Sequence, residues 1–297
     1  MDFKNAKELL ELCQKENLPI SEIMLQRELT EGEMPMEEAH NRMAHALEIM
    51  KESAHNPIQT PVRSMGGLIG GEAGKLASHQ AAGRGICGDV LEKAITYAVA
   101  VLETNASMGL IVAAPTAGSA GVVPGMLLAL QECHSFSDED LIKALFNAGA
   151  IGCLAMRNAT VAGAVGGCQA EVGAASGMAA AALVDIKGGT AEQCAEAFAM
   201  ALTNLEGLVC DPVAGLVEIP CIKRNVIGAM NAVSAADMAL AGVVGHIPAD
   251  EVIDAMAEVG NAMSKDLRET GIGGLAGTPT GRAICEIVTM DNGEEED

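Results

Sequence analysis

Three cysteines in the chain stand among residue types that suit a buried metal site. Cys168 lies in Gly-Gly-Cys-Gln-Ala-Glu, and Cys210 and Cys221 are the two ends of Cys-Asp-Pro-Val-Ala-Gly-Leu-Val-Glu-Ile-Pro-Cys. A proline near each end of this second segment breaks helical structure, so we expect loops to present both side chains. No two cysteines form a close Cys-x-x-Cys pair. The pattern indicates a metal cluster held by three thiolates from separate segments.

The spacing of these cysteines favours iron over zinc. Structural zinc sites commonly use four ligands in two close pairs, whereas three dispersed cysteines suit an iron–sulfur cluster with one open iron. A non-catalytic scaffold whose thiols hold a structural metal is the alternative. Cys87 is left unassigned, and four other cysteines are interpreted as small buried hydrophobic residues: Cys13, Cys133, Cys153 and Cys194.

Four stretches combine glycine with polar residues in otherwise apolar surroundings. Glycine allows a close backbone approach to a ligand, and successive amides with Ser or Thr hydroxyls form an anion-binding concavity. A small carboxylate would suit such a site. The first stretch lacks the Gly-Lys-Ser/Thr ending of a phosphate loop, which argues against a nucleotide. The stretches are residues 63–75, 103–109, 114–121 and 271–281.

Composition excludes several classes of function. The 297 residues include 18 basic and 40 acidic ones, and a net charge of -22 disfavours nucleic acid and anionic membranes. The longest apolar runs, 109–130 and 161–184, contain prolines or buried-type polar residues and are interpreted as core segments rather than membrane spans. The chain opens without a secretory signal, and its nine cysteines are odd in number and widely spaced. We therefore expect a cytoplasmic protein with free thiols.

The pattern of apolar residues predicts an all-α fold of Ala- and Gly-rich helices around a buried site. We expect one catalytic domain over residues 1–297, with peripheral amphipathic helices in 1–55 and an acidic tail in 290–297 whose last four residues, 294–297, are disordered. In the first part, Pro19 should end a helix over 6–16, with Ser21 as the next N-cap. The further helices predicted are about 35–52, 90–102, 141–156, 172–183, 191–205, 225–241 and 249–268, with Cys285 on another.

Taken together, the polar motifs resemble the α subunit of the iron–sulfur L-serine dehydratases. The resemblance extends from about residue 20 to residue 288, and its motifs are long and specific. They are Ser-Met-Gly-Gly from 64, Glu-Thr-Asn-Ala-Ser-Met-Gly from 103, Ala-Pro-Thr-Ala-Gly-Ser from 114, Gly-Cys-Gln-Ala-Glu from 167, Cys-Asp-Pro-Val-Ala-Gly from 210, Pro-Cys at 220–221 and Arg-Asn at 224–225.

The resemblance implies a helical chain that carries a 4Fe-4S cluster on Cys168, Cys210 and Cys221. It also implies dehydration of L-serine to pyruvate and ammonia, in amino-acid degradation and gluconeogenesis, with the open iron acting as a Lewis acid on the substrate hydroxyl. Several residues would then bind the substrate or support the site, and the general base is not assigned: Ser64, Asn105, Ser107, Thr116, Ser119 and Asn225.

This chain departs from the family pattern in two ways, and each departure leads to an expectation. Single-chain relatives have a β-type domain ahead of this region, so we expect a separate β subunit here, in an oligomeric heteromer. Some relatives end in a cysteine that caps the open iron, whereas the last cysteine here is Cys285, which makes capping doubtful. A related cysteine desulfidase is the enzyme alternative, because it would differ only in the leaving group.

Overall fold

The computed structural model describes residues 1–293 and confirms the all-α fold. Within this range the backbone forms helices and turns without a β-strand, apart from one isolated bridge between Cys210 and Arg268. The helices are α1 (Ala6–Glu16), α2 (Ile20–Thr30), α3 (Met36–Gln59), α4 (Glu72–Ala81), α5 (Asp89–Ala106), α6 (Val122–His134), α7 (Asp138–Asn158), α8 (Gly163–Gly166), α9 (Ala174–Ile186), α10 (Ala191–Thr203), α11 (Cys221–Leu240), α12 (Ala249–Ala262) and α13 (Pro279–Gly293). Short turns are η1 (Ala117–Ser119), η2 (Gln169–Gly173, a π-type turn), η3 (Val213–Gly215) and η4 (Lys265–Leu267).

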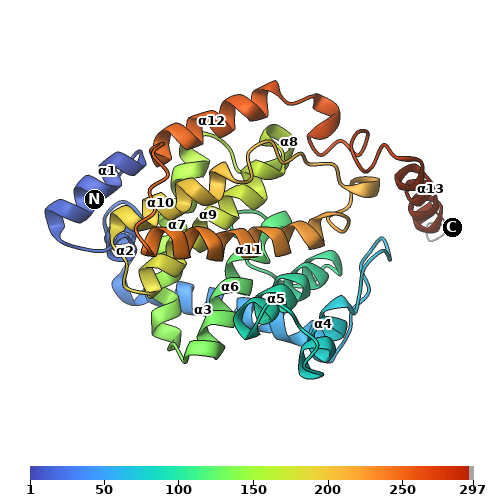
Figure 1. Ribbon diagram of the computed structural model, residues 1–297, viewed down its shortest axis with the longest axis horizontal. Coiled ribbons are helices and arrows are strands. Elements are labelled where there is room, and N and C mark those ends of the chain that lie inside the picture. The colour runs from blue at the N-terminus through green and yellow to red at the C-terminus, as the bar shows by residue number, and fades with distance from the viewer. Residues whose placement is uncertain (294–297) are drawn as a thin grey trace.

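Helix α9 lies at the centre of the molecule, with α6, α7, α10 and α11 packed around it (Figure 1). Ten of its eleven residues from 174 to 184 are Ala, Gly, Leu, Val or Met, and all eleven are buried. Gly177 shows how close the neighbouring helix approaches, since a Cβ there would lie 2.3 Å from Phe198 Cδ2. Small residues therefore allow α9 and α10 to pack closely.

A second group of helices lies below this centre, where α5 packs against α3, α4, α6 and α11 (Figure 1). Helix α12 covers the opposite side and contacts α10 and α8. Helix α13 lies at one edge of the molecule, beyond a segment of turns after α12, and packs on η3. The segments that join these groups, 107–121, 159–173 and 204–220, run between them and carry most of the predicted polar motifs.

Most of the predicted helices are confirmed, with two corrections. The helix expected over 249–268 ends at Ala262, because Met263 takes an extended conformation and Ser264 caps the short turn η4. Ser21 was expected as an N-cap, but Pro19 is the N-cap of α2 and Ser21 is buried within its first turn. Proline fits that position because it has no N–H group to leave unpaired.

Helix α6 occupies the apolar run that prolines interrupt. Pro124 is the third residue of this helix, where a missing N–H group costs no intrahelical hydrogen bond. Within residues 1–293, every helix is too short or too polar to cross a bilayer. The predicted disorder of the acidic tail concerns mainly residues 294–297, which lie outside the described range.

A buried carboxylate fixes the start of α4. Glu103 on α5 is 1% exposed, and its Oε1 accepts the backbone N–H groups of Glu72, at 2.5 Å, and Ala73, at 3.3 Å. Burial, followed by the neighbouring Glu72 side chain, raises the pKa of Glu103 from 4.5 to about 7. The Gly-rich loop before α4 is therefore anchored by a carboxyl group whose pKa lies near neutral pH.

Replacing Glu103 with Gln should remove this pH dependence while keeping an acceptor for α4. The folded state binds the Glu103 proton more tightly than the unfolded chain, so its contribution to stability falls as pH rises from 4.5 towards 8. Between pH 6 and pH 8, the wild type should lose about 1 kcal/mol of unfolding free energy relative to Glu103→Gln. Denaturant unfolding at several pH values measures this, with exposed Glu258→Gln as the control. If the unfolding free energies of the wild type and of Glu103→Gln change with pH to the same extent, Glu103 does not have a raised pKa in the folded protein.

Candidate metal centre

Cys168 is placed by a tight turn that ties together two distant parts of the chain. It follows α8 through Gly167, whose φ is 76°, and it immediately precedes η2. The next residue, Gln169, is fully buried; its side chain donates to the carbonyl of Met256 and accepts from the N–H of Gly207. The turn that carries Cys168 is therefore fixed to α12 and to the segment that leads to Cys210.

Cys210 is held in an extended segment by two backbone hydrogen bonds. Its N–H donates to Leu267 O at 2.8 Å, and its carbonyl accepts the N–H of Glu269 at 2.6 Å. These bonds form the isolated parallel bridge with the strand-like segment after η4. The side chain is 2% exposed, so the loop expected from the nearby proline presents its thiol to the interior of the molecule.

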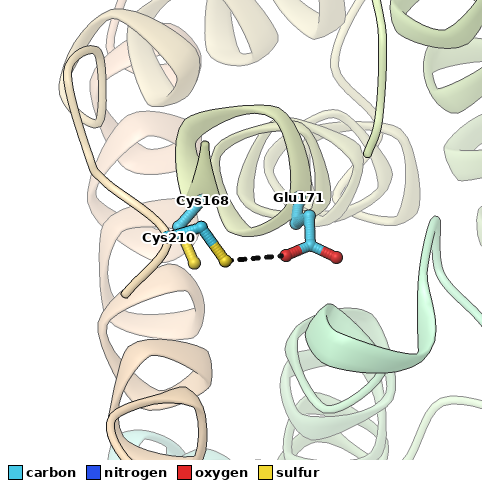
Figure 2. A group of neighbouring side chains, drawn as sticks. All are labelled: Cys168, Glu171 and Cys210. Atoms are coloured by element: carbon cyan, nitrogen blue, oxygen red, sulfur yellow. Dashed lines mark hydrogen bonds between the residues drawn. The ribbon is translucent and has the colours of Figure 1, made fainter. Parts of the chain in front are cut away.

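The thiols of Cys168 and Cys210 meet the carboxylate of Glu171 in one buried cluster (Figure 2). One ligand atom from each of the three residues lies within 4.8 Å of the others. Cys210 Sγ is 3.9 Å from Glu171 Oε2, and Thr116 Oγ1 donates to Glu171 Oε1 at 2.8 Å. Thiolate and carboxylate ligands at this spacing can bind a metal ion. Among residues 1–290, whose side chains the structure describes, this is the one such group of His, Cys, Asp and Glu.

Glycine leaves the space that this cluster occupies. A Cβ at Gly163 would lie 2.5 Å from Glu171 Oε2 and 3.0 Å from Cys210 Sγ, distances that no real side chain tolerates without movement. The first residue of α8 must therefore be small for the carboxylate and the thiol to lie side by side.

Cys221 is near the cluster but outside its closest group. It is the first residue of α11, is 6% exposed, and follows the cis bond between Ile219 and Pro220. Burial, then the negative charges of Cys168 and Glu171, raises the pKa of its thiol to about 12. Of the three cysteines expected to bind the cluster, the structure thus brings Cys168 and Cys210 together and leaves Cys221 as a buried neighbour.

The pKa values of the two central thiols are shifted in opposite directions. The pKa of the Cys168 thiol is lowered, first by the hydrogen bond from Cys210 and then, against the effect of burial, by the Arg224 guanidinium. The same hydrogen bond and burial raise the pKa of Cys210. Of the two thiols, Cys168 is therefore the one whose deprotonated form the site favours. Burial also raises the pKa of Glu171, although Thr116 donates to it.

Three of the predicted polar residues lie in the turn beside this cluster. Thr116 and Ser119 form a reciprocal capping box around η1, with their hydroxyl oxygens 3.0 Å apart. Asn225 of α11 is fully buried and fixes this turn, since its Oδ1 accepts the Gly121 N–H and its Nδ2 donates to Gly118 O. The turn is thus held between Glu171 and α11.

The other three predicted polar residues lie elsewhere. Asn105 and Ser107 are at the C-terminal end of α5, where the Ser107 hydroxyl donates to the carbonyl of Thr104. Ser64 belongs to the loop beside this end, because the N–H of Met65 donates to Ala106 O. The structure does not join these residues to the cysteine cluster by a side-chain hydrogen bond within the described range.

The first Gly-rich loop does bind an anion, but that anion is part of the protein. The carboxylate of Glu218 accepts the Ser64 hydroxyl at 2.6 Å and the N–H groups of Gly66 and Leu68 at 2.7 and 3.1 Å. Glu218 is 2% exposed and lies between Cys210 and Cys221 in the sequence. It therefore ties the loop at 64–69 to the segment that joins two of the candidate ligands.

Sequence reasoning did not assign the charged residues of the site. Glu171 is three residues after Cys168, a spacing that places both side chains on one face of a helical turn. Arg224 is likewise three residues after Cys221, and Asp211 is adjacent to Cys210. Each charged residue thus has a position next to, or one turn from, a candidate ligand, and this is the signal that could have found it.

Replacing Glu218 with Ala should strongly destabilise the fold. The change leaves one buried hydroxyl and two partly buried N–H groups without their acceptor, and should cost about 2–4 kcal/mol of unfolding free energy. Denaturant unfolding measures the cost, and hydrogen exchange should show faster opening at residues 64–69. Glu258→Ala, on the exposed face of α12, is the control. Equal stability of the two variants would show that this carboxylate does not hold the loop.

Comparison with known proteins relates this geometry to a family. The sequence matches the family described as "Serine dehydratase alpha chain" over residues 15–276. It is 52% identical to the "Probable L-serine dehydratase, alpha chain" of Bacillus subtilis (strain 168), covering 95% of this chain and 94% of that protein. It is 44% identical to the "L-serine dehydratase, alpha chain" of Peptoniphilus asaccharolyticus, covering 95% and 97%. It is 39% identical to the "L-serine dehydratase" of Helicobacter pylori (strain J99 / ATCC 700824), covering 93% of this chain but 62% of that protein. These matches confirm the resemblance seen in the motifs, and the chain belongs to the serine dehydratase alpha chain family.

Proposed function

We propose that the chain is the catalytic α subunit of an L-serine dehydratase, a lyase that forms pyruvate and ammonia. Serine loses its β-hydroxyl group as water together with the Cα proton, and the resulting enamine takes up water to release ammonia. The observation that carries the proposal is the buried convergence of Cys168, Glu171 and Cys210 in a chain of this family. A site of this kind can hold a metal beside a turn that suits a small carboxylate.

The donor set fits an iron–sulfur cluster. The two buried thiols and the Glu171 carboxylate have ligand atoms within 4.8 Å of one another, and the pKa of the Cys168 thiol is lowered by the neighbouring Cys210 thiol and the Arg224 guanidinium. We propose Cys168, Cys210 and Cys221 as the ligands of a 4Fe-4S cluster, with Glu171 as an oxygen donor at its edge. When bound, the cluster supplies a Lewis acid for the departing hydroxyl group.

The protein groups around the site hold the Glu171 carboxylate in place and are proposed to bind the substrate. Thr116 fixes the Glu171 carboxylate through its hydroxyl group, and Glu171 Oε2 can hold a proton, because burial favours the neutral form. We propose that the substrate carboxylate binds at the η1 turn. Ser119 of this turn is fully buried, and Asn225 holds the turn by a hydrogen bond. Ser64, in the first Gly-rich loop, and Asn105 and Ser107, at the C-terminal end of α5, stay proposed substrate-binding residues.

A separate β subunit is part of the proposal. The Bacillus and Peptoniphilus relatives are named alpha chains, and this chain spans 62% of the Helicobacter protein, which is therefore longer by a substantial segment. We propose that the chain forms one catalytic domain and works in an oligomer with a β chain that supplies the missing segment.

Reconstitution under anaerobic conditions tests the function. The chain, loaded with iron and sulfide and mixed with its β partner, should form pyruvate from L-serine much faster than from L-cysteine. Iron and sulfide content and the visible spectrum report the cluster independently of activity. A strong preference for cysteine would replace the proposed substrate, whereas a colourless, air-stable zinc protein without activity would refute the lyase.

Single cysteine substitutions separate ligands from packing residues. Ala in place of Cys168, Cys210 or Cys221 should each abolish the cluster chromophore and lower serine turnover by more than about 100-fold, because a metal ligand is lost. Cys13→Ala, at a buried position on α1, is the matched control and should keep both. If Cys221→Ala keeps the chromophore, the site uses the Cys168, Glu171 and Cys210 group without it. If Cys13→Ala loses the chromophore, the loss reports folding and the ligand assignment fails.

A further inference from the structure

Arg224 contacts every segment that carries a candidate ligand. It lies on α11, in the turn that follows Cys221, and its side chain is 14% exposed. Its Nη1 donates to Val209 O at 2.7 Å and lies 3.7 Å from Cys168 Sγ. Its Nη2 is 2.7 Å from Asp211 Oδ1. One guanidinium therefore links the helix of Cys221, the sulfur atom of Cys168 and both neighbours of Cys210.

Asp211 extends this link to the last Gly-rich segment. Its side chain is 4% exposed, and its Oδ2 accepts the N–H of Leu275 at 2.6 Å. A Cβ at Gly274 would lie 2.2 Å from Asp211 Oδ2, so the backbone of this segment approaches the carboxylate as closely as glycine allows. The ion pair thus fixes the segment that connects α12 to α13, in addition to the cysteine segments.

The geometry requires the planar guanidinium group rather than a positive charge alone. Two nitrogens of one plane contact a carbonyl and a carboxylate on either side of Cys210 and the sulfur atom of Cys168, and arginine presents several donors in a fixed arrangement. Lysine has one nitrogen at the end of a flexible chain and cannot make all of these contacts at once. The cation also compensates part of the negative charge that thiolates bring into a buried site.

We infer that Arg224 is a positioning residue that orders the three cysteine segments before a metal binds. The inference rests on the proposed function only for its choice of ligands. Without Arg224, the segments of Cys168 and Cys210 lose their common contact with α11, and Asp211 keeps a buried charge without its partner. The thiols then reach the metal-binding arrangement in a smaller fraction of molecules, and the apparent affinity for metal falls by that fraction.

Binding of Co²⁺ to the metal-free full-length chain tests this inference without any assay of activity. The sulfur-to-cobalt charge-transfer absorption reports thiolate ligands directly. Arg224→Met should weaken Co²⁺ binding by about 10–100-fold, and Arg224→Lys should restore only part of it. Arg27→Met removes a more exposed ion pair, with Asp2, outside the segments of Cys168, Cys210 and Cys221, and should bind Co²⁺ as the wild type does. Unchanged Co²⁺ affinity and spectrum in Arg224→Met would overturn the inference.

A double variant keeps the test decisive if the buried charge prevents folding. Asp211→Asn combined with Arg224→Met removes both charges, so it avoids an unpaired buried carboxylate. Mass spectrometry of alkylated thiols should show faster modification of Cys168 and Cys210 in this variant than in the wild type. Wild-type modification rates would overturn the inference. The outcome is separate from the proposed function. A chain whose Co²⁺ affinity depends on Arg224 but which never forms pyruvate would refute only the dehydratase.

Discussion

Burying two thiols and a carboxylate in one small space is the constraint on which the rest of the site depends. Cys168, Glu171 and Cys210 bring groups that repel one another when all are ionised, and burial increases the cost of each charge. The structure meets this cost with opposite pKa shifts of the two thiols, a raised pKa at Glu171 and the guanidinium of Arg224. A bound cation would complete this compensation, which is why the arrangement suits a metal.

The surrounding fold provides rigid supports for segments that are themselves irregular. Ala- and Gly-rich helices pack closely around α9, and the loops between helices are held by buried side chains rather than by a sheet. Gln169, Glu218 and Asn225 each accept or donate several hydrogen bonds across segments far apart in the sequence. The polar groups that pattern analysis identified as ligand-binding thus include many that bind the protein's own backbone. This use of buried polar residues fixes where the ligand-bearing turns can lie.

Most helices were predictable because their apolar residues recur with a clear helical period, but α4 and α6 were not among the predicted helices. The end of α12 was not, since the residues after Ala262 continue to look helical while Ser264 instead caps a short turn. At the site, the cysteines were recognisable from their polar and proline-containing surroundings. The partners of the Gly-rich loop were not, because a nest of N–H groups looks the same whether it binds a substrate or a distant Glu218. Only the three-dimensional structure shows which segments meet.

The central claim is that Cys221 is a ligand. This distinguishes a three-cysteine cluster from a metal site formed by Cys168, Glu171 and Cys210. The most direct measurement is an anaerobic crystal structure of the iron- and sulfide-loaded chain, with anomalous scattering recorded at the iron edge. Our account predicts iron density bonded to the sulfur atoms of Cys168, Cys210 and Cys221, with one iron free of protein sulfur. Iron density that leaves Cys221 unbound, or that lies away from Cys168 and Cys210, would contradict it.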